Sequence, residues 1–251
     1  MRWLIAITLF ASPAALAEEN SYQTAFTEGR YEEAVDLAQS ISSPDRLAFA
    51  ARSLLADAVS KSDFDPPLLL IDNAEQLARE ALVMDSNHIE ARLQLAIALS
   101  LKARPLSNRE AMRAGYGEEA KDLADGVLLD DPNNTYAHGF LAVWHLEVRR
   151  RGGAIGASVL GASVKKARRH YQQAVELSPE DASVHWQYGR ALTALNAKKY
   201  RGEAESALNA ALSCRSNSML EHVMQERAQV LQTVLHSQKR SATEKLAARM
   251  L

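Results

Sequence analysis

The feature that most constrains this chain is a helical pattern that recurs about every forty residues. In each copy an alanine is followed by a second landmark residue four positions later and a third after three more. A proline or serine then follows within a few residues. Spacing of four and then three places the three side chains on one face of a helix, and the proline or serine ends that helix. The copies are Ala74, Ala78 and Ala81; Ala120, Ala124 and Val127; Ala167, Tyr171 and Ala174; Ala204, Leu208 and Ala211; and a degenerate copy at Ala34, Ala38 and Ile41.

A second helical pattern precedes each full copy. The segments EARLQLAIALSL, YAHGFLAVWHLE and SVHWQYGRALTAL share one register, in which Arg92, His138 and His185 align. Strand-like alternation of polar and apolar residues is absent from the sequence. The repeating unit is therefore a pair of helices, A and then B, that buries its apolar face only by stacking on neighbouring pairs.

The pattern resembles the tetratricopeptide repeat (TPR) family, most clearly in YQQAVELSPEDASVHWQYGRAL at residues 171–192. The resemblance implies an all-α fold, a right-handed α-solenoid of about five TPR-like helix hairpins over residues 18–236. Residues 237–251 are left as a polar C-terminal tail or short helix. The copies are longer than the usual 34-residue unit, and the surplus falls into enlarged loops between helices A and B. Two such A–B loops are LKARPLSNREAMRAGYG at residues 101–117 and the glycine-rich segment Gly152–Val164.

The first seventeen residues have the order of a secretory signal peptide. Arg2 precedes a short apolar run, and Ala15, Leu16 and Ala17 place small residues before a cleavage point. No cysteine follows to carry a lipid anchor, and no later segment holds the roughly 20 apolar residues that span a bilayer. We expect cleavage before Glu18 and a secreted or periplasmic protein without a transmembrane helix.

The cations of the chain are predicted to gather along one edge. All A–B loops of such a solenoid emerge on the same side, and the stretch from Arg149 to Arg169 holds seven basic residues and no acid. Cations at the start of the second helix oppose its dipole, so an anionic surface, a membrane periphery or carboxylates of a neighbouring repeat are expected to face them. This basic edge consists of Arg149, Arg150, Arg151, Lys165, Lys166, Arg168 and Arg169.

The concave face is the predicted partner-binding surface, since the A helices line it in proteins that the repeat resembles. Trp186 with Arg190 one helical turn later suits a peptide or an acidic side chain, although packing of Trp186 on the next repeat is an equal alternative. The groove positions implied by the register are Glu90, Leu93, Ile97, Tyr136, Val143, Ser183, Trp186 and Arg190.

The sequence offers little support for catalysis. Gly156 and Gly161 have the spacing of a phosphate-binding loop, but the lysine that such a loop needs is missing. His138, His145 and His185 occupy helix-packing positions and lack the carboxylates or further histidines of a metal site. We therefore predict no catalytic residues, no metal, no cofactor and no enzymatic activity.

These observations together predict an exported TPR-like adaptor or scaffold that binds a protein or peptide partner in a cell-envelope assembly. Export removes nucleic acid from the expected partners. The alternative is a periplasmic small-ligand-binding or transport-accessory protein with a pocket in the concave face. A closed apolar cavity of several hundred Å³ would favour that alternative.

Overall fold

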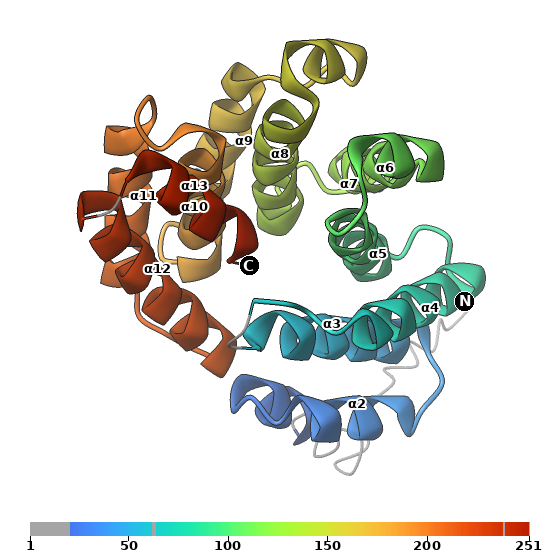
Figure 1. Ribbon diagram of the computed structural model, residues 1–251. Helices are drawn as coiled ribbons and strands as arrows, with labels where there is room; N and C mark the ends of the chain where they lie inside the picture. Colours follow the sequence, from blue (N-terminus) through green and yellow to red (C-terminus); the bar gives the residue numbers. More distant parts are fainter. Residues whose placement is uncertain (1–20, 62–63, 238, 251) are drawn as a thin grey trace, which may run out of the picture.

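The repeats fold into a strongly curved helical solenoid (Figure 1). The structure is a computed structural model that describes residues 21–61, 64–237 and 239–250. All regular secondary structure in these residues is helical, which confirms the all-α class. A first helix spans residues 21–27, and the others are α2 (Tyr31–Gln39), α3 (Pro44–Ser60), α4 (Leu68–Met84), α5 (Ile89–Ala103), α6 (Asn108–Ala114), α7 (Tyr116–Asp130), α8 (Thr135–Val159), α9 (Val164–Leu177), α10 (Ala182–Asn196), α11 (Arg201–Ser213), α12 (Met219–Ser237) and α13 (Arg240–Arg249).

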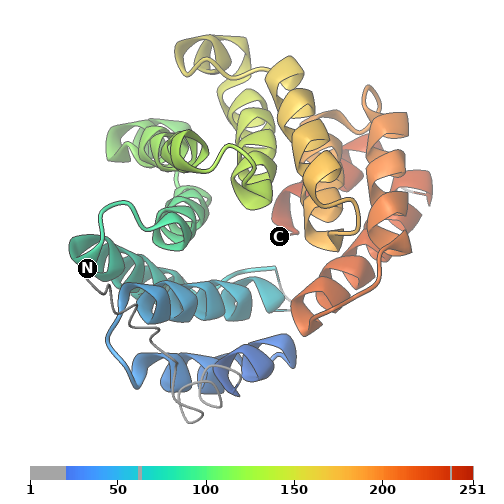
Figure 2. The same cartoon turned by 180° about the vertical axis from the view of Figure 1, so that it is seen from behind.

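Consecutive helices pair into the predicted hairpins. The pairs are residues 21–27 with α2, α3 with α4, α5 with α7, α8 with α9 and α10 with α11, and α12 and α13 follow. Neighbouring A helices pack on one another, α3 on α5 and α8 on α10, and line the inside of the curve. The B helices α4, α7, α9 and α11 lie outside them (Figures 1 and 2). The α-solenoid expected from the repeats is confirmed.

The repeated alanines are the sites of close helix contact. Every landmark alanine of α4, α7, α9 and α11 is completely buried, and so are Val127 and Leu208. A methyl side chain at such a position lets a neighbouring backbone approach closely, as the repeat pattern requires. Two landmarks differ: Tyr171 is half-buried, and Ile41 of the degenerate copy lies beyond the end of α2 and is exposed.

One aligned position in the A helices links each A helix to the turn before it and to a neighbouring B helix. His138 and His185, which align in the sequence, each reach the carbonyl oxygen of the proline six residues before them, at 3.1 and 2.9 Å. Their other ring nitrogens meet the following or preceding B helix. These contacts confirm that the two histidines pack between helices. The pairs are His138 with His170, His185 with Tyr171 and, at the aligned position of the preceding repeat, Arg92 with Asp130.

The two long A–B loops contain additional helix. The first holds α6, which begins at a capping box formed by Ser107 and Glu110. In the second, α8 continues past the expected loop start and breaks at Gly153, whose φ of 62° and ψ of −150° favour glycine. Ser163 then caps α9. Most of the stretch Gly152–Val164 is therefore a kinked helical extension of α8, and residues 160–163 form the turn that leads into α9.

The curvature brings the two ends of the solenoid together. Arg227 of α12 donates hydrogen bonds to the carbonyl oxygens of Val59 and Lys61, at 2.6 and 2.8 Å, where α3 ends. Its guanidinium also lies over the ring of Phe64. Terminal helix carbonyls have no partner within their own helix, so a cation suits this position. The solenoid is closed into a ring by α12, and α13 lies at the inner side of α10 (Figure 1).

Candidate functional site

The predicted groove residues separate into an open section and a covered section of the inner face. Tyr136 is 58% exposed, and Glu90 keeps about a third of its side chain exposed. Trp186 is 0% and Arg190 1% exposed, and Leu93 is also buried. The remaining predicted positions are half-buried, and they are Ile97, Val143 and Ser183.

The open section collects polar side chains from four parts of the ring. Arg52 of α3 lies 3.6 Å from the carboxylate of Glu90 on α5. The pKa of Tyr136 is raised to about 12, mainly by partial burial of its hydroxyl and next by the negative charge of Asp181. The positive charge of Arg52 opposes this shift. Because α5 separates α3 from α8, Arg52 and Tyr136 can face each other only across the inner surface. Asp181 is in turn held by Ser183, whose hydroxyl donates to it at 2.5 Å.

The covered section lies under α13, which corrects the expectation that Trp186 and Arg190 form an open binding pair. Trp186 belongs to one buried apolar cluster with Ala247 of α13, with Met250 directly after that helix, and with side chains of α11 and α12. Arg190 donates to the carbonyl oxygen of Ala247 at 3.3 Å. The aromatic and the guanidinium are therefore adjacent to a helix of the same chain, which covers the positions that the repeat register assigns to a partner.

A partly buried charge network lies beside the covered section. Arg190 and Arg150 both pair with Glu147, at 3.2 and 2.7 Å. Burial alone would raise the pKa of Glu147, but Arg190, Arg150 and Arg104 together hold it below its ordinary value. Burial, and then the charge of Arg190, lower the pKa of Arg104 to about 9, so its guanidinium is still cationic at neutral pH. This network carries more positive than negative charge beside the end of α13.

Arg104 completes the contact with α13. Its guanidinium donates to the carbonyl oxygens of Ala248 and Arg249, the latter at 3.4 Å. These acceptors are the last carbonyls of α13, which carry the negative end of the helix dipole. Two arginines from distant parts of the ring, Arg104 and Arg190, therefore bind the C-terminal end of one helix.

Much of the predicted basic edge is neutralised within the protein. Arg168 makes a bidentate pair with Glu203 of the next repeat, at 2.8 to 3.1 Å, as the neighbouring-carboxylate alternative requires. Arg151 caps the end of α5 through the Ala103 carbonyl, and Lys166 binds the Gly161 carbonyl. Within the described residues, Lys165 and Arg169 are exposed and have no ion-pair partner.

Exposed apolar side chains accompany the remaining cations at the two long loops. Ala157 and Ala162 pack back on Trp144, as expected if the glycine-rich segment folds onto the solenoid. Ile155 is nevertheless 81% exposed, and Val159 of the same segment and Met112 of α6 are also exposed. The tip of the Gly152–Val164 segment thus presents apolar side chains close in sequence to Lys165 and Arg169.

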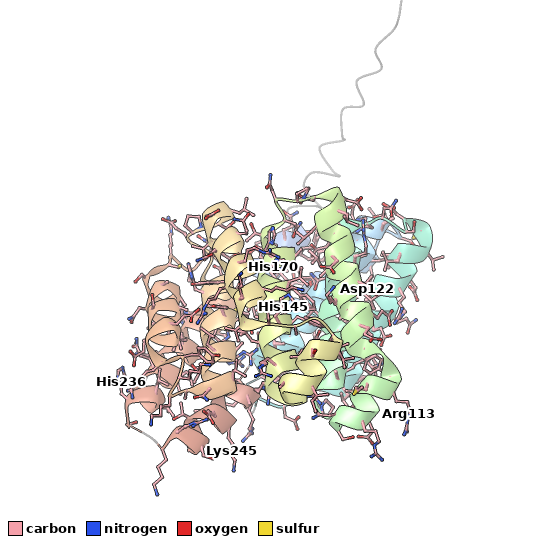
Figure 3. The ribbon with its side chains drawn as sticks, turned by 90° about the horizontal axis from the view of Figure 1, so that it is seen from above. Arg113, Asp122, His145, His170, His236 and Lys245 are labelled. Carbon is pink, nitrogen blue, oxygen red and sulfur yellow. The ribbon has the colours of Figure 1, made fainter. Side chains whose placement is uncertain are left out.

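Three histidines meet where α8 packs on α9, and two of them, His145 and His170, are labelled in Figure 3. The Nδ1 atoms of His138 and His170 are 2.9 Å apart, and the rings of His145 and His170 lie 5.7 Å apart. Burial, followed by neighbouring positive charges, lowers the pKa of both His145 and His170 to about 4. In the part of the chain that the structure describes, no group of three or more His, Cys, Asp or Glu side chains is arranged to hold a metal ion.

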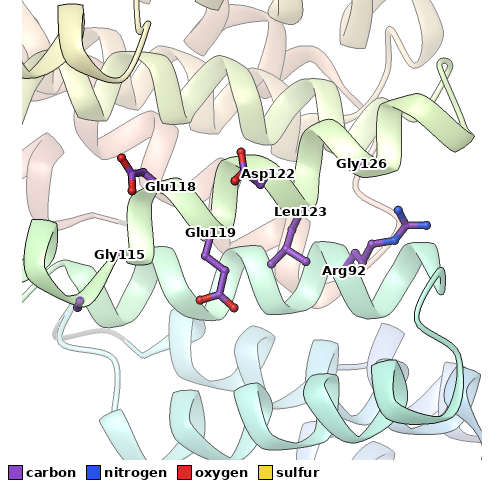
Figure 4. A pocket seen from close by; sticks show the side chains of 8 residues that line it. Arg92, Gly115, Glu118, Glu119, Asp122, Leu123 and Gly126 are labelled. Atoms are coloured by element: carbon purple, nitrogen blue, oxygen red, sulfur yellow. The ribbon is translucent and has the colours of Figure 1, made fainter.

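Two surface depressions lie against the B helices α7 and α4. One, of about 580 Å³, opens between α5 and α7 and is lined by Glu118, Glu119, Asp122 and Arg92 (Figure 4). Arg92 and Glu119 are already paired, with Asp130 and Arg79. A second, of about 400 Å³, lies along α4. Both are open and lined by charged residues, unlike the closed apolar cavity expected of a small-ligand carrier.

The comparisons with known proteins agree with this architecture. The family described as "Regulator of microtubule dynamics protein 1-3" matches residues 23–236. The chain belongs to this family. None of the curated proteins matches the chain.

A solved TPR structure shares the fold of this family member. TTC0263, a thermophilic TPR protein of Thermus thermophilus, superposes with a TM-score of 0.60 at 18% identity, covering 86% of this chain and 98% of that one. MamA of Desulfovibrio magneticus RS-1 aligns over 87% of this chain and 98% of its own, with 17% identity and a TM-score of only 0.42. The resemblance to TPR proteins is confirmed as a matter of fold.

The N-terminal prediction lies outside the described residues, because the proposed signal peptide occupies residues 1–17. Among the residues that are described, no helix combines the length and apolar character needed to cross a membrane.

Neither α13 nor Arg104 was predicted as part of the inner face. Thr243, Ala247 and Met250 are buried and follow the same spacing of four and three as the repeat landmarks. That pattern in the C-terminal tail was the available signal. Arg104 had none, because only the ring geometry brings it to the end of α13.

Proposed function

We propose that this protein is a scaffold that binds a protein or peptide partner through the inner face of its helical ring. The observation that carries the proposal is the open section, where Arg52, Glu90, Tyr136 and Asp181 from separate parts of the ring meet. An exposed tyrosine beside charged groups provides apolar area and a hydrogen-bonding group at low entropic cost, which suits recognition of a peptide.

Site-specific photo-cross-linking would test the scaffold proposal. A photoreactive amino acid at Tyr136 is compared with the same residue at Leu129, an exposed apolar position on the outer helix α7. We expect a discrete cross-linked partner from position 136 and none from 129, and Tyr136→Ala should weaken capture of that purified partner at least fivefold without lowering the melting temperature. Equal cross-linking from both positions would contradict an inner binding face. Assembled microtubules are included as a probe because the family description names microtubule dynamics.

We also propose export to the periplasm or outside the cell, with the scaffold serving a cell-envelope assembly. This rests on the residues at positions 1–17 alone. N-terminal sequencing of the protein from its native cells should begin at Glu18. An intact Met1 would refute export while leaving the scaffold proposal in place.

A second candidate function is contact with an anionic membrane surface through the tip of the glycine-rich segment. Ile155 and Val159 are exposed and lie close in sequence to the exposed Lys165 and Arg169, and such apolar and cationic groups together bind lipid headgroups. Because Arg168 and Lys166 have internal partners, the informative variant reverses only Lys165 and Arg169 to Glu.

Vesicle co-sedimentation across a salt series would test the second candidate. Wild-type binding to anionic vesicles should weaken as salt rises, since exposed charges are screened. The Lys165→Glu/Arg169→Glu variant should lose that binding, whereas Lys198→Glu/Lys199→Glu on the next loop should retain most of it. Wild-type binding that neither salt nor the reversal changes would remove the membrane function.

A further inference from the structure

We infer that the covered section of the inner face is a docking site for an α-helix and that α13 is its displaceable resident. The inference deepens the proposed function, because it names the kind of partner that the inner face accepts. That partner is an amphipathic helix with small and apolar residues at spacings of four and three, whose C-terminal end carries carbonyl or carboxylate oxygens.

The side chains of α13 show what the site accepts. Thr243, Ala247 and Met250 form one buried stripe, while most of the remaining helix is exposed or half-buried. The stripe contacts the cluster that contains Trp186, on the A helix that the repeat register assigns to the groove. A helix with small residues at these positions can approach α10 closely, and a larger side chain in place of Ala247 cannot.

The charges of the site select the end of the helix. Arg104 and Arg190 donate to the carbonyls of Ala247, Ala248 and Arg249, the negative end of the α13 dipole. Arg190 belongs to α10 and Arg104 directly follows α5, so the two cations are brought together by the fold of the ring and not by α13. A helix that docks in the opposite direction would bring its positive end to the two arginines.

The site has an unmet polar group while α13 occupies it. The indole Nε1 of Trp186 is buried without a hydrogen-bond acceptor. A buried donor without a partner is costly, and no described group of α13 accepts a hydrogen bond from this one. A ligand helix with an acceptor side chain near Trp186 would satisfy it and bind more strongly than the resident helix does.

The ring does not need α13 for closure. Arg227 of α12 makes the contact with α3, and the family match ends at residue 236, before α13 begins. Arg190 also keeps partners when α13 leaves, because it pairs with Glu147 at 3.2 Å and with Gln187 at 3.1 Å. The N-terminal end of α13 has no side-chain cap. Release of the helix is therefore a local event in an otherwise intact ring.

A peptide with the sequence of residues 239–250 is the probe for this site, so the test needs no unidentified partner. In the full chain, Ala247→Glu should undock α13, because its carboxylate would replace a completely buried methyl group. The labelled peptide should bind this variant at least tenfold more tightly than the wild type, whose own helix competes at high effective concentration. Adding Arg104→Ala should reduce that affinity at least fivefold.

Hydrogen exchange on the same full-length proteins separates undocking from unfolding. Ala247→Glu should lose protection in α13 alone and keep it in α3 to α11. Loss of protection throughout the ring, or a folded variant that binds the peptide no better than the wild type does, would overturn the inference.

A milder variant keeps the inference testable if Ala247→Glu does not fold. Arg104→Ala should speed exchange of α13 at least fivefold with an unchanged melting temperature, because the described hydrogen bonds of this side chain go to α13. Arg109→Ala, on an exposed neighbouring position, should change neither. Unaltered α13 exchange in Arg104→Ala would refute the role of the arginine. Failure of the peptide arms leaves the Tyr136 cross-linking result unaffected, so the two proposals can fail separately.

Discussion

Acidification should destabilise this protein through His145 before its carboxylates titrate. The side chain is 2% exposed, its Nδ1 has no hydrogen-bond partner, and it lies near His170, Lys166 and Lys121, with Asp125 opposing them. Burial is the largest cause, and together with the nearby positive charges it lowers the pKa from 6.5 to about 4. Between these two pKa values the unfolded chain therefore binds more protons than the folded protein does. The contribution of neutral His145 to the free energy of unfolding is complete above pH 6.5 and is lost as the pH falls toward 4.

The size of the effect follows from the two pKa values. Between pH 7 and pH 5, His145 alone should remove about 2 kcal/mol from the free energy of unfolding. Replacing it in His145→Leu should cost little at pH 7, since the buried nitrogen has no partner to lose. The variant should consequently decline about 2 kcal/mol less than the wild type over this range.

Urea unfolding followed by circular dichroism, at intervals between pH 7 and pH 5, measures the difference. Carboxylates contribute mainly near and below their ordinary pKa of 4.5, which lies outside this range. His222→Leu, which removes an exposed histidine, is the matched control. Identical slopes in the wild type and in His145→Leu would refute the argument that burial keeps His145 neutral.

Three further predictions concern packing and ring closure. Trp186→Ala should lower the free energy of unfolding by about 3–5 kcal/mol in urea, and a loss below about 1 kcal/mol would show that the indole is not a core side chain. Gly189→Ala should lower the melting temperature, since its new Cβ would lie 3.1 Å from Leu208 Cγ. Gly202→Ala, with open space around it, should raise the melting temperature slightly. Shifts of the same sign in the two variants would contradict the packing argument. Arg227→Ala should open the ring and increase the radius of gyration in small-angle X-ray scattering, and an unchanged radius would mean that other contacts close it.

Local pattern was sufficient for the repeat architecture. The alanine landmarks determine which helix faces are buried, because spacing of four and three defines a face without any knowledge of neighbours. The interhelical role of His138 and His185 followed from their shared register. The start of α9 at Val164 was equally readable, since Ser163 is a strong N-cap at the end of a glycine-rich segment.

What the sequence alone could not determine depends on long-range geometry. The register assigned Trp186 and Arg190 to the inner face, but only the packing of α13 back onto α10, past α11 and α12, covers them. The basic edge likewise looked unpaired along the chain, because Glu203, which neutralises Arg168, lies 35 residues away. Helix periodicity is a local property set by backbone geometry. Which surface another segment then covers depends on small rotations summed over many repeats, and these are decided only when the side chains of distant helices pack.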